Sequence, residues 1–333
     1  MFERIIISMG LILSLAFGYL AWADDALPSP QSTTTMIDIA GNPVPVLAGG
    51  LYDRYRSNPP LSVIASEAPE IDLSWFKTLT KTKVDMGFES YSPNFYYNNT
   101  RITAVFTADL DRLKALMPKE VLEKVSPVAV WPGRGVVALT AYDYKYCDND
   151  SYYELALSIV TRKPDSFNFG IFSLIGESIS KDFWGYVLKL PVNRELARVR
   201  GVVGYNLPKW LAPMTYQEKD RSVVFELIDA ATGNVDITLE GKKLEALSDV
   251  GSVSRTNFIN LDQEGRLTHG YSDSRSLGKA STSDKDAVTL TLTDGSLSTF
   301  MKSLKLGKLL KYEYEPAFQA ALYAPELVEN HDQ

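Results

Sequence analysis

Cysteine and histidine are scarce in this sequence of 333 residues, which contains one cysteine and two histidines. The single Cys147 excludes an internal disulfide. Its acidic neighbours predict a spectator thiol with a raised pKa rather than a nucleophile. The two histidines, His269 and His331, leave little material for a catalytic triad or a histidine-rich metal site. We therefore predict no metal site.

The sequence also lacks several familiar motifs. It has no Walker phosphate loop, no dinucleotide-binding glycine pattern, no nucleophile elbow and no zinc-protease motif. These absences argue against nucleotide-dependent enzymes and the commonest hydrolases. The 34 basic and 41 acidic residues give a net charge of -7, and an acidic chain is poorly suited to binding nucleic acid. We predict no nucleic-acid partner.

The N-terminal segment is typical of a cleaved secretory signal peptide. An apolar run over residues 5–20 precedes Ala21-Trp22-Ala23, which puts small residues at the two positions that a signal peptidase reads. We predict that residues 1–23 form a signal peptide and that the protein is secreted or periplasmic. The alternative is an uncleaved anchor, because residues 5–23 are just long enough to span a bilayer. Only then would the membrane be a partner.

The rest of the chain predicts a β-rich domain. Residues 24–60 are rich in Pro, Ser, Thr and Gly, which predicts a linker or an extended N-terminal arm that wraps the domain. Residues 61–333 alternate runs of β-branched and aromatic residues with polar turns. Strands are predicted at residues 101–106, 135–144, 152–161, 184–192, 222–228, 234–240, 256–260 and 287–292.

Helices are expected to be few. Apolar spacing predicts one at residues 108–117, a second at 194–200 with Asn193 as its N-cap, and a third that begins at a Ser296 cap. The predicted fold class is therefore mainly β (α+β). Its core is an antiparallel, β-barrel-like cone with a few flanking α-helices in one domain.

Residues 201–211 set one lysine, Lys209, among apolar neighbours directly after a proline. A lysine becomes a nucleophile when its ammonium form is destabilised, and burial beside Tyr205, Leu207 and Trp210 would do this. Taken alone, a Pro-Lys pair is also compatible with a solvated turn. The surrounding segments decide between the two.

Four segments occur in the order typical of one enzyme family. They are Phe-Thr-Ala-Asp-Leu at 106–110, with Pro118 behind it; Tyr-Tyr-Glu-Leu at 152–155; Leu-Pro-Lys at 207–209; and Phe-Glu-Leu-Ile at 225–228. Across residues 98–326 the sequence resembles the acetoacetate decarboxylase family, whose Schiff-base lysine follows a proline in a similar segment.

This resemblance implies a cone with a lysine at the base of an apolar cavity, where the lysine condenses with the keto group of a small keto acid. Lys209 would be the nucleophile and Glu154 the general acid/base, unless Glu154 is a strand residue that faces water. Arg101 would bind the substrate carboxylate, although a surface arginine is the alternative. Tyr205 and Trp210 would line the substrate site. No cofactor is predicted, and a homo-oligomer is a further prediction because family members tend to assemble.

Two departures from the family pattern keep a second function open. The family's decarboxylases carry a second lysine where this chain has Trp210, and in them that cation lowers the pKa of the reactive lysine. A second glutamate is also missing near Leu139 and Thr140. The first hypothesis is an exported Schiff-base lyase of altered specificity. The alternative is a non-catalytic exported barrel that binds a small apolar or aromatic ligand.

Overall fold

The computed structural model describes residues 33–328. The predicted signal peptide and His331 lie outside these residues. Residues 34–328 belong to one compact unit. Within the described part of the chain, no helix is long and apolar enough to cross a membrane.

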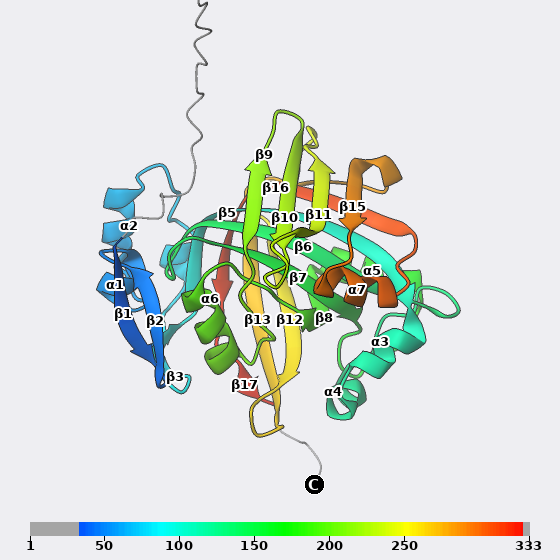
Figure 1. The fold of residues 1–333 in the computed structure, drawn as a ribbon, viewed down its shortest axis with the longest axis horizontal. Helices are drawn as coiled ribbons and strands as arrows, with labels where there is room; N and C mark the ends of the chain where they lie inside the picture. The colour runs from blue at the N-terminus through cyan, green and yellow to red at the C-terminus, as the bar shows by residue number, and fades with distance from the viewer. Residues whose placement is uncertain (1–32, 329–333) are drawn as a thin grey trace, which may run out of the picture. The chain divides into compact units, whose positions relative to one another are not determined.

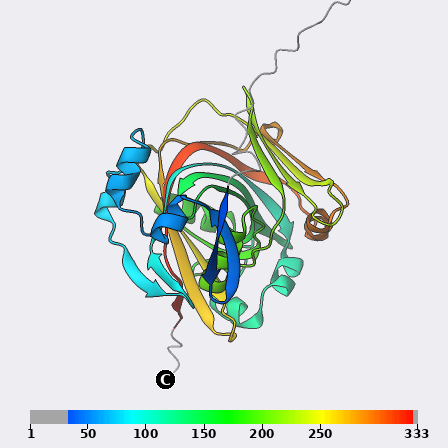
Figure 2. The same cartoon turned by 60° about the vertical axis from the view of Figure 1, so that its left-hand side comes forward.

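The centre of the fold is a closed barrel of seven strands (Figures 1 and 2). The hydrogen-bonded order is β16–β5–β6–β7–β8–β12–β13, and β13 pairs back to β16. The strands are β5 (Asn94–Asp109), β6 (Arg134–Cys147), β7 (Tyr152–Thr161), β8 (Asp182–Lys189), β12 (Val253–Leu261), β13 (Leu267–Ser276) and β16 (Leu309–Leu322). The predicted barrel is confirmed, but it is mixed rather than antiparallel, because β8 and β12 run parallel. Two short strands, β14 (Ala280–Thr282) and β17 (Glu326–Leu327), pair with β16 and β13, respectively.

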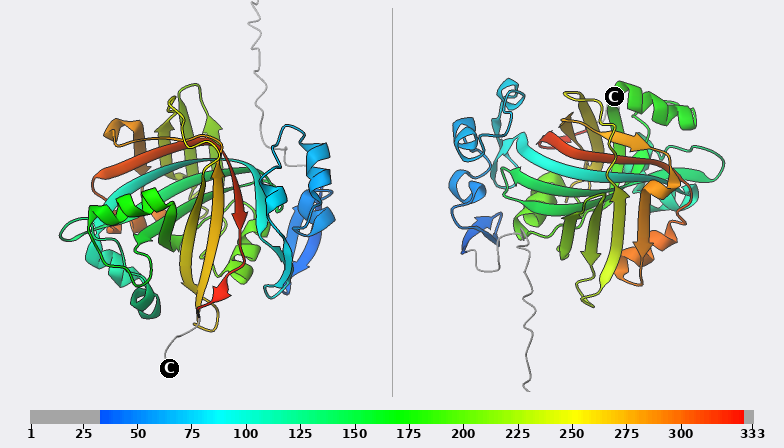
Figure 3. Two further views of the ribbon diagram at one scale, coloured as in Figure 1. Left: turned by 180° about the vertical axis from the view of Figure 1, so that it is seen from behind. Right: turned by 90° about the horizontal axis from the view of Figure 1, so that it is seen from above.

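A second sheet covers one side of the barrel (Figure 3). It consists of β9 (Met214–Glu218), β10 (Ser222–Ile228), β11 (Val235–Lys242) and β15 (Val288–Leu292). The main core lies between the two, where Leu139 and Leu155 of the barrel belong to the same fully buried cluster as Phe225. The outer face of these barrel strands is therefore the apolar one, and their inner face is free to carry polar residues.

The described N-terminal elements pack on the domain. Within the predicted arm, β1 (Thr34–Ile39) and β2 (Asn42–Leu47) form a hairpin, and α1 (Leu51–Tyr55) follows it. The hairpin shares a buried cluster with α6 (Glu195–Val199). It thereby anchors the segment that leads to Lys209. Next come α2 (Leu61–Glu67), the 3-10 turn η1 (Phe76–Thr78) and the hairpin of β3 (Thr82–Asp85) with β4 (Glu89–Ser92).

The predicted helices exist with shifted ends. The first is α3 (Leu110–Leu116), because β5 continues to Asp109, whose carboxylate accepts a hydrogen bond from the Arg112 backbone N–H. α4 (Lys119–Lys124) follows it. The third is α7 (Ser296–Ser303), whose first turn donates backbone N–H groups to Asp236 of β11 rather than to a Ser296 side chain. An unpredicted helix, α5 (Ile171–Ser180), precedes β8.

The second predicted helix, at residues 194–200, extends further than predicted. α6 continues into a π-helical turn, η2 (Arg200–Gly204). Asn193 does not cap α6. Its side chain accepts a hydrogen bond from the Tyr153 backbone N–H instead. The element before the lysine segment is thus longer than the sequence pattern predicts, and its last turn is wider than an α-helical turn.

Candidate active site

Lys209 reaches the barrel through a short, irregular segment after η2. Asn206 adopts a left-handed backbone conformation (φ 55°), and the Lys209 backbone N–H donates to the Leu207 carbonyl at 2.8 Å. The segment then pairs with Val192, whose N–H donates to the Trp210 carbonyl at 2.9 Å. Val192 also bridges to Glu154 of β7. Two residues 55 positions apart in the sequence are therefore held side by side.

Lys209 and Glu154 form a buried ion pair. The distance from Lys209 Nζ to Glu154 Oε2 is 2.5 Å, and the two side chains are 6% and 8% exposed. The second carboxylate oxygen, Oε1, accepts a hydrogen bond from the Tyr144 hydroxyl at 3.3 Å. Because taking one charge out of water without its partner is costly, each member of this pair depends on the other. The arrangement places a lysine amine within direct proton-transfer distance of a carboxylate.

Gly201 makes room for the lysine side chain. A Cβ atom at this position would lie 2.3 Å from Lys209 Cδ and 2.6 Å from Cε. Contacts this short do not occur between real side-chain carbons, so any other residue would push the lysine aside. The path of the Lys209 side chain therefore requires glycine at position 201.

Tyrosine side chains surround the ion pair. Lys209 Nζ lies 5.5 Å from the centre of the Tyr152 ring, which is a cation–π distance. The Tyr152 ring packs on Tyr144 at 4.7 Å, and its hydroxyl bonds that of Tyr96 at 3.1 Å. Burial first, and the Glu154 charge second, raise the pKa of Tyr144 well above its ordinary value. Tyr144 therefore remains a hydrogen-bond donor.

One row of residues crosses four neighbouring strands on the inner face. Glu315, Arg101, Tyr142 and Glu154 are directly opposite one another on β16, β5, β6 and β7, and such partners share a face of the sheet. Arg101 Nη2 lies 2.6 Å from Glu315 Oε2, and the arginine side chain is 14% exposed. Burial disfavours the guanidinium, but Glu315 outweighs it and the pKa of Arg101 is raised. Arg101 is therefore an interior residue rather than a surface one.

The other two predicted residues lie elsewhere. Tyr205 is buried in an apolar cluster with Met86, Leu207 and Phe258. Trp210 packs against the main core outside the barrel, with Lys189 Nζ 5.9 Å from its ring. The structure brings Lys209, Glu154 and Arg101 together inside the barrel, but it does not bring Trp210 to them.

Sequence reasoning missed the tyrosines and Glu315. Tyr142 and Tyr144 are two apart in β6, which places them on one face of a strand, so this spacing was a usable signal. Glu315 gave no such signal because β16 was not predicted. At the position of the missing glutamate, Thr140 faces the interior and bonds Thr103. Among residues 33–328, no cluster of three or more His, Cys, Asp or Glu side chains could hold a metal ion.

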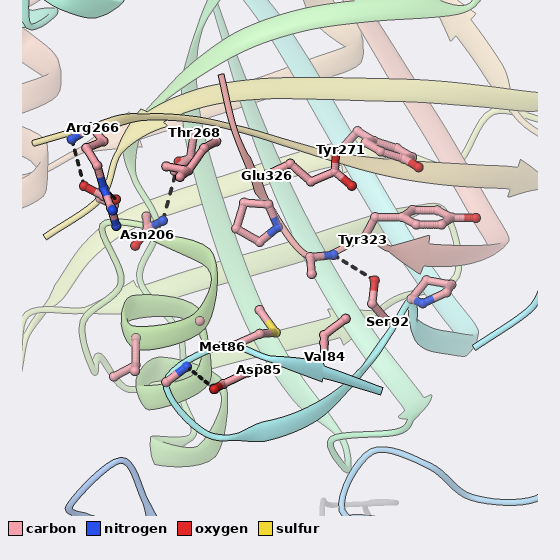
Figure 4. Close-up of a pocket in the computed structure, with 18 of the residues that line it drawn as sticks. Val84, Asp85, Met86, Ser92, Asn206, Arg266, Thr268, Tyr271, Tyr323 and Glu326 are labelled. Carbon is pink, nitrogen blue, oxygen red and sulfur yellow. Dashed lines mark hydrogen bonds and ion pairs between the residues drawn. The ribbon is translucent and has the colours of Figure 1, made fainter. Parts of the chain in front are cut away.

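A cleft of about 690 Å³ opens near the lysine segment (Figure 4). Val84 and Met86 of the β3–β4 hairpin line one side of it, and Asn206 and Thr268 line another. Met86 also belongs to the apolar cluster of Tyr205 and Leu207. The floor of the cleft is thus shared with the cluster that packs beside the Lys209 segment.

Comparisons with known proteins identify the fold. No protein-family model matches the sequence, and no curated protein matches it. Solved structures do match. An acetoacetate decarboxylase from Legionella pneumophila subsp. pneumophila str. Philadelphia 1 aligns with a TM-score of 0.53 and 13% identity, over 72% of this chain and 88% of that one. The chain has the acetoacetate decarboxylase fold.

Two further structures agree with this assignment. A second acetoacetate decarboxylase aligns with a TM-score of 0.53 and 13% identity, over 72% of this chain and 91% of the other. The enduracididine biosynthesis enzyme MppR, complexed with pyruvate, aligns with a TM-score of 0.50 and 12% identity, over 72% and 92%. The family resemblance read from the sequence is confirmed for the fold.

Proposed function

We propose that this protein is a Schiff-base-forming lyase of the acetoacetate decarboxylase type that acts on a small keto acid through Lys209. The observation that carries the proposal is the 2.5 Å contact between Lys209 Nζ and Glu154 Oε2 inside the barrel. A buried lysine beside a carboxylate has a proton acceptor available when its amine attacks a carbonyl carbon. The acetoacetate decarboxylase fold supports the same chemistry.

The proposed reaction begins with transfer of a proton from Lys209 to Glu154. The free amine attacks the keto carbon, and the proton returns from Glu154 to the departing hydroxyl, which leaves as water. The resulting iminium draws the electron pair of the neighbouring carbon–carboxylate bond, and CO₂ departs to give an enamine. A proton from solvent then adds to the enamine carbon, and water hydrolyses the imine. The ketone is released and Lys209 is restored.

The role of Arg101 in this proposal is limited by its ion pair with Glu315. Its guanidinium already binds Glu315, whose side chain is 1% exposed. A substrate carboxylate would have to share or displace that partner. We propose that Arg101 orients the substrate carboxylate from within the Arg101–Glu315 pair, because Tyr142 alone separates it from Glu154 along the inner-face row.

The proposal is tested by borohydride trapping with a panel of small keto acids, followed by peptide mass mapping. Lys209→Arg keeps a cation beside Glu154 but removes the amine that forms an imine. Lys189→Ala is the matched control, because Lys189 packs near Trp210 and Phe300. We expect a reduced adduct on Lys209 in the wild type and in Lys189→Ala, and none in Lys209→Arg. An adduct on no lysine of the folded protein, or one that survives Lys209→Arg, would refute the proposal.

A further inference from the structure

A groove of about 290 Å³ lies beside the segment that precedes Lys209. Its walls come from β8, the end of β12, η2 and the segment before the lysine. Most of its lining residues are apolar, among them Val187, Val202, Leu207, Pro208 and Leu261, and one of them, Asp262, is charged. Mostly apolar hollows with a few polar groups are the usual composition of small-molecule sites in proteins.

The groove and the lysine share their walls. Val202 follows Gly201, against whose Cα the Lys209 side chain passes, and Pro208 directly precedes Lys209. Val187 pairs with Ser158, which is four residues beyond Glu154 on the same face of β7. The groove thus begins where the inner face of the barrel meets the lysine segment.

Asn260 contributes a buried donor to this groove. The residue is 4% exposed, and its Nδ2 has no hydrogen-bond partner within residues 33–328. An unsatisfied buried donor costs about 1–3 kcal/mol. A ligand oxygen in the groove would remove that cost. The lining therefore suits an apolar group that carries one hydrogen-bond acceptor.

The neighbouring cleft has the opposite character. Carboxylates line it, namely Asp85, Asp262, Glu264 and Glu326, whereas Arg266 is its one basic lining residue. Arg266 is held by Asp262 and Glu264 at 2.7 and 2.8 Å. This excess of negative charge repels a carboxylate, although Val84 and Met86 add apolar surface to the cleft. The groove has one lining carboxylate, Asp262, which it shares with the cleft, and is therefore the better suited of the two hollows to an apolar chain.

We infer that the groove binds the apolar tail of the carbonyl substrate. This inference rests on the proposed function and narrows it: the substrate class is an oxo acid with an extended apolar tail, one oxygen of which accepts from Asn260. The groove, at about 290 Å³, is far larger than the space one methyl group fills. Acetoacetate would leave it unfilled.

The test measures tail binding without imine formation. The variant is Lys209→Met combined with Glu154→Gln, which forms no imine and leaves neither charge unpaired. Calorimetric titration with 2-butanone, 2-hexanone, 2-octanone and 2-decanone should show Kd falling about fourfold for each added CH₂. Adding Val202→Trp should abolish this dependence on length, because the indole fills the groove. Adding Val250→Trp, at a site 73% exposed on the surface, should preserve it.

A second variant addresses the buried amide. Asn260→Leu should tighten binding of the plain alkyl ketones, because an apolar side chain of similar size adds apolar contact with the tail. Weaker or unchanged binding would contradict the place given to Asn260. Kd values that do not change with chain length, or that Val202→Trp leaves as they were, would overturn the groove assignment.

The two proposals fail separately. Trapping of 3-oxo acids on wild-type Lys209 tests the Schiff-base chemistry, whereas ketone titration tests the groove. Trapping that succeeds equally with short and long acids, together with flat ketone titrations, keeps the chemistry and discards the tail site. Length-dependent ketone binding without any trapping keeps the groove as an apolar binding site and discards the lyase.

Discussion

The ion pair between Lys209 and Glu154 should behave as a strongly coupled unit in unfolding experiments. Both side chains are less than a tenth exposed and meet at 2.5 Å. Removing one partner leaves the other buried without compensation, which costs about 3–5 kcal/mol. We therefore expect Glu154→Gln or Lys209→Met alone to lower the urea midpoint by about 2 M, at an m-value of about 2 kcal/mol per M.

The double variant should reverse this loss. Replacing both members of a buried pair by uncharged residues of similar size is neutral or stabilises proteins by about 1–4 kcal/mol. Simple addition of the two single losses would instead give about 6–10 kcal/mol of destabilisation. The Tyr144 hydroxyl can still donate to the glutamine carbonyl, so no new unsatisfied group arises there.

The control is an exposed ion pair with a similar contact distance. Arg54 and Glu67 meet at 2.6 Å with side chains 34% and 38% exposed, and exposed pairs contribute about 0–1 kcal/mol. Urea unfolding of the four buried-pair proteins and of Glu67→Gln tests the reasoning. If a single buried-pair variant loses less than 1 kcal/mol, or the losses add, Lys209 and Glu154 are not the desolvated pair described here.

Three further predictions concern the site and its surroundings. Gly201→Ala should abolish trapping on Lys209 with little change in the circular dichroism spectrum, because its Cβ would lie 2.3 Å from Lys209 Cδ; normal trapping would contradict this. Glu315→Gln should lower the keto acid concentration for half-maximal trapping several-fold, because the substitution frees Arg101 for the substrate carboxylate. A ketone without a carboxylate should show no such change. Asp143 is a pH-dependent case: burial first, and Glu218 in addition, raise the pKa of Asp143 to about 6 against the opposing effect of Lys145. Its folded-state pKa lies above the unfolded value, so the contribution of Asp143 to stability is greatest below pH 4 and is lost as the pH rises through 6. Asp143→Asn should therefore stabilise the protein at pH 8, by at most about 3 kcal/mol before solvent screening, and should not stabilise it at pH 3.5. Equal effects at both pH values in urea titrations would argue against a buried carboxyl.

The sequence predicts best where local patterns decide the structure. The strands expected at residues 152–161 and 222–228 coincide with β7 and β10, because turn residues bound each run and its side chains alternate. The barrel itself follows from the number of such runs and from the family resemblance. The parallel pairing of β8 with β12 did not follow, because local patterns carry no information on which strand lies beside which.

β16 was missed because its inner face is charged. Tyr312 and Tyr314 face the core, whereas Glu313 and Glu315 alternate with them and face inward. Such a run resembles a solvated edge until its partners are known. Those partners are Lys311 for Glu313 and Arg101 for Glu315, at 2.7 and 2.6 Å. Only the closed barrel shows that these carboxylates are interior.

Trp210, which stands where the family's decarboxylases have a second lysine, does not face the amine of Lys209. Residue 210 points to the main core outside the barrel, where its ring lies near Lys189, while Lys209 points inward to Glu154. A cation at position 210 would share the outer side with Lys189 and would be separated from Lys209 Nζ by the backbone. Under the proposed function, activation of Lys209 would depend on what surrounds its own amine: the Glu154 carboxylate, which can take its proton, and the Tyr152 ring, which suits a cationic imine.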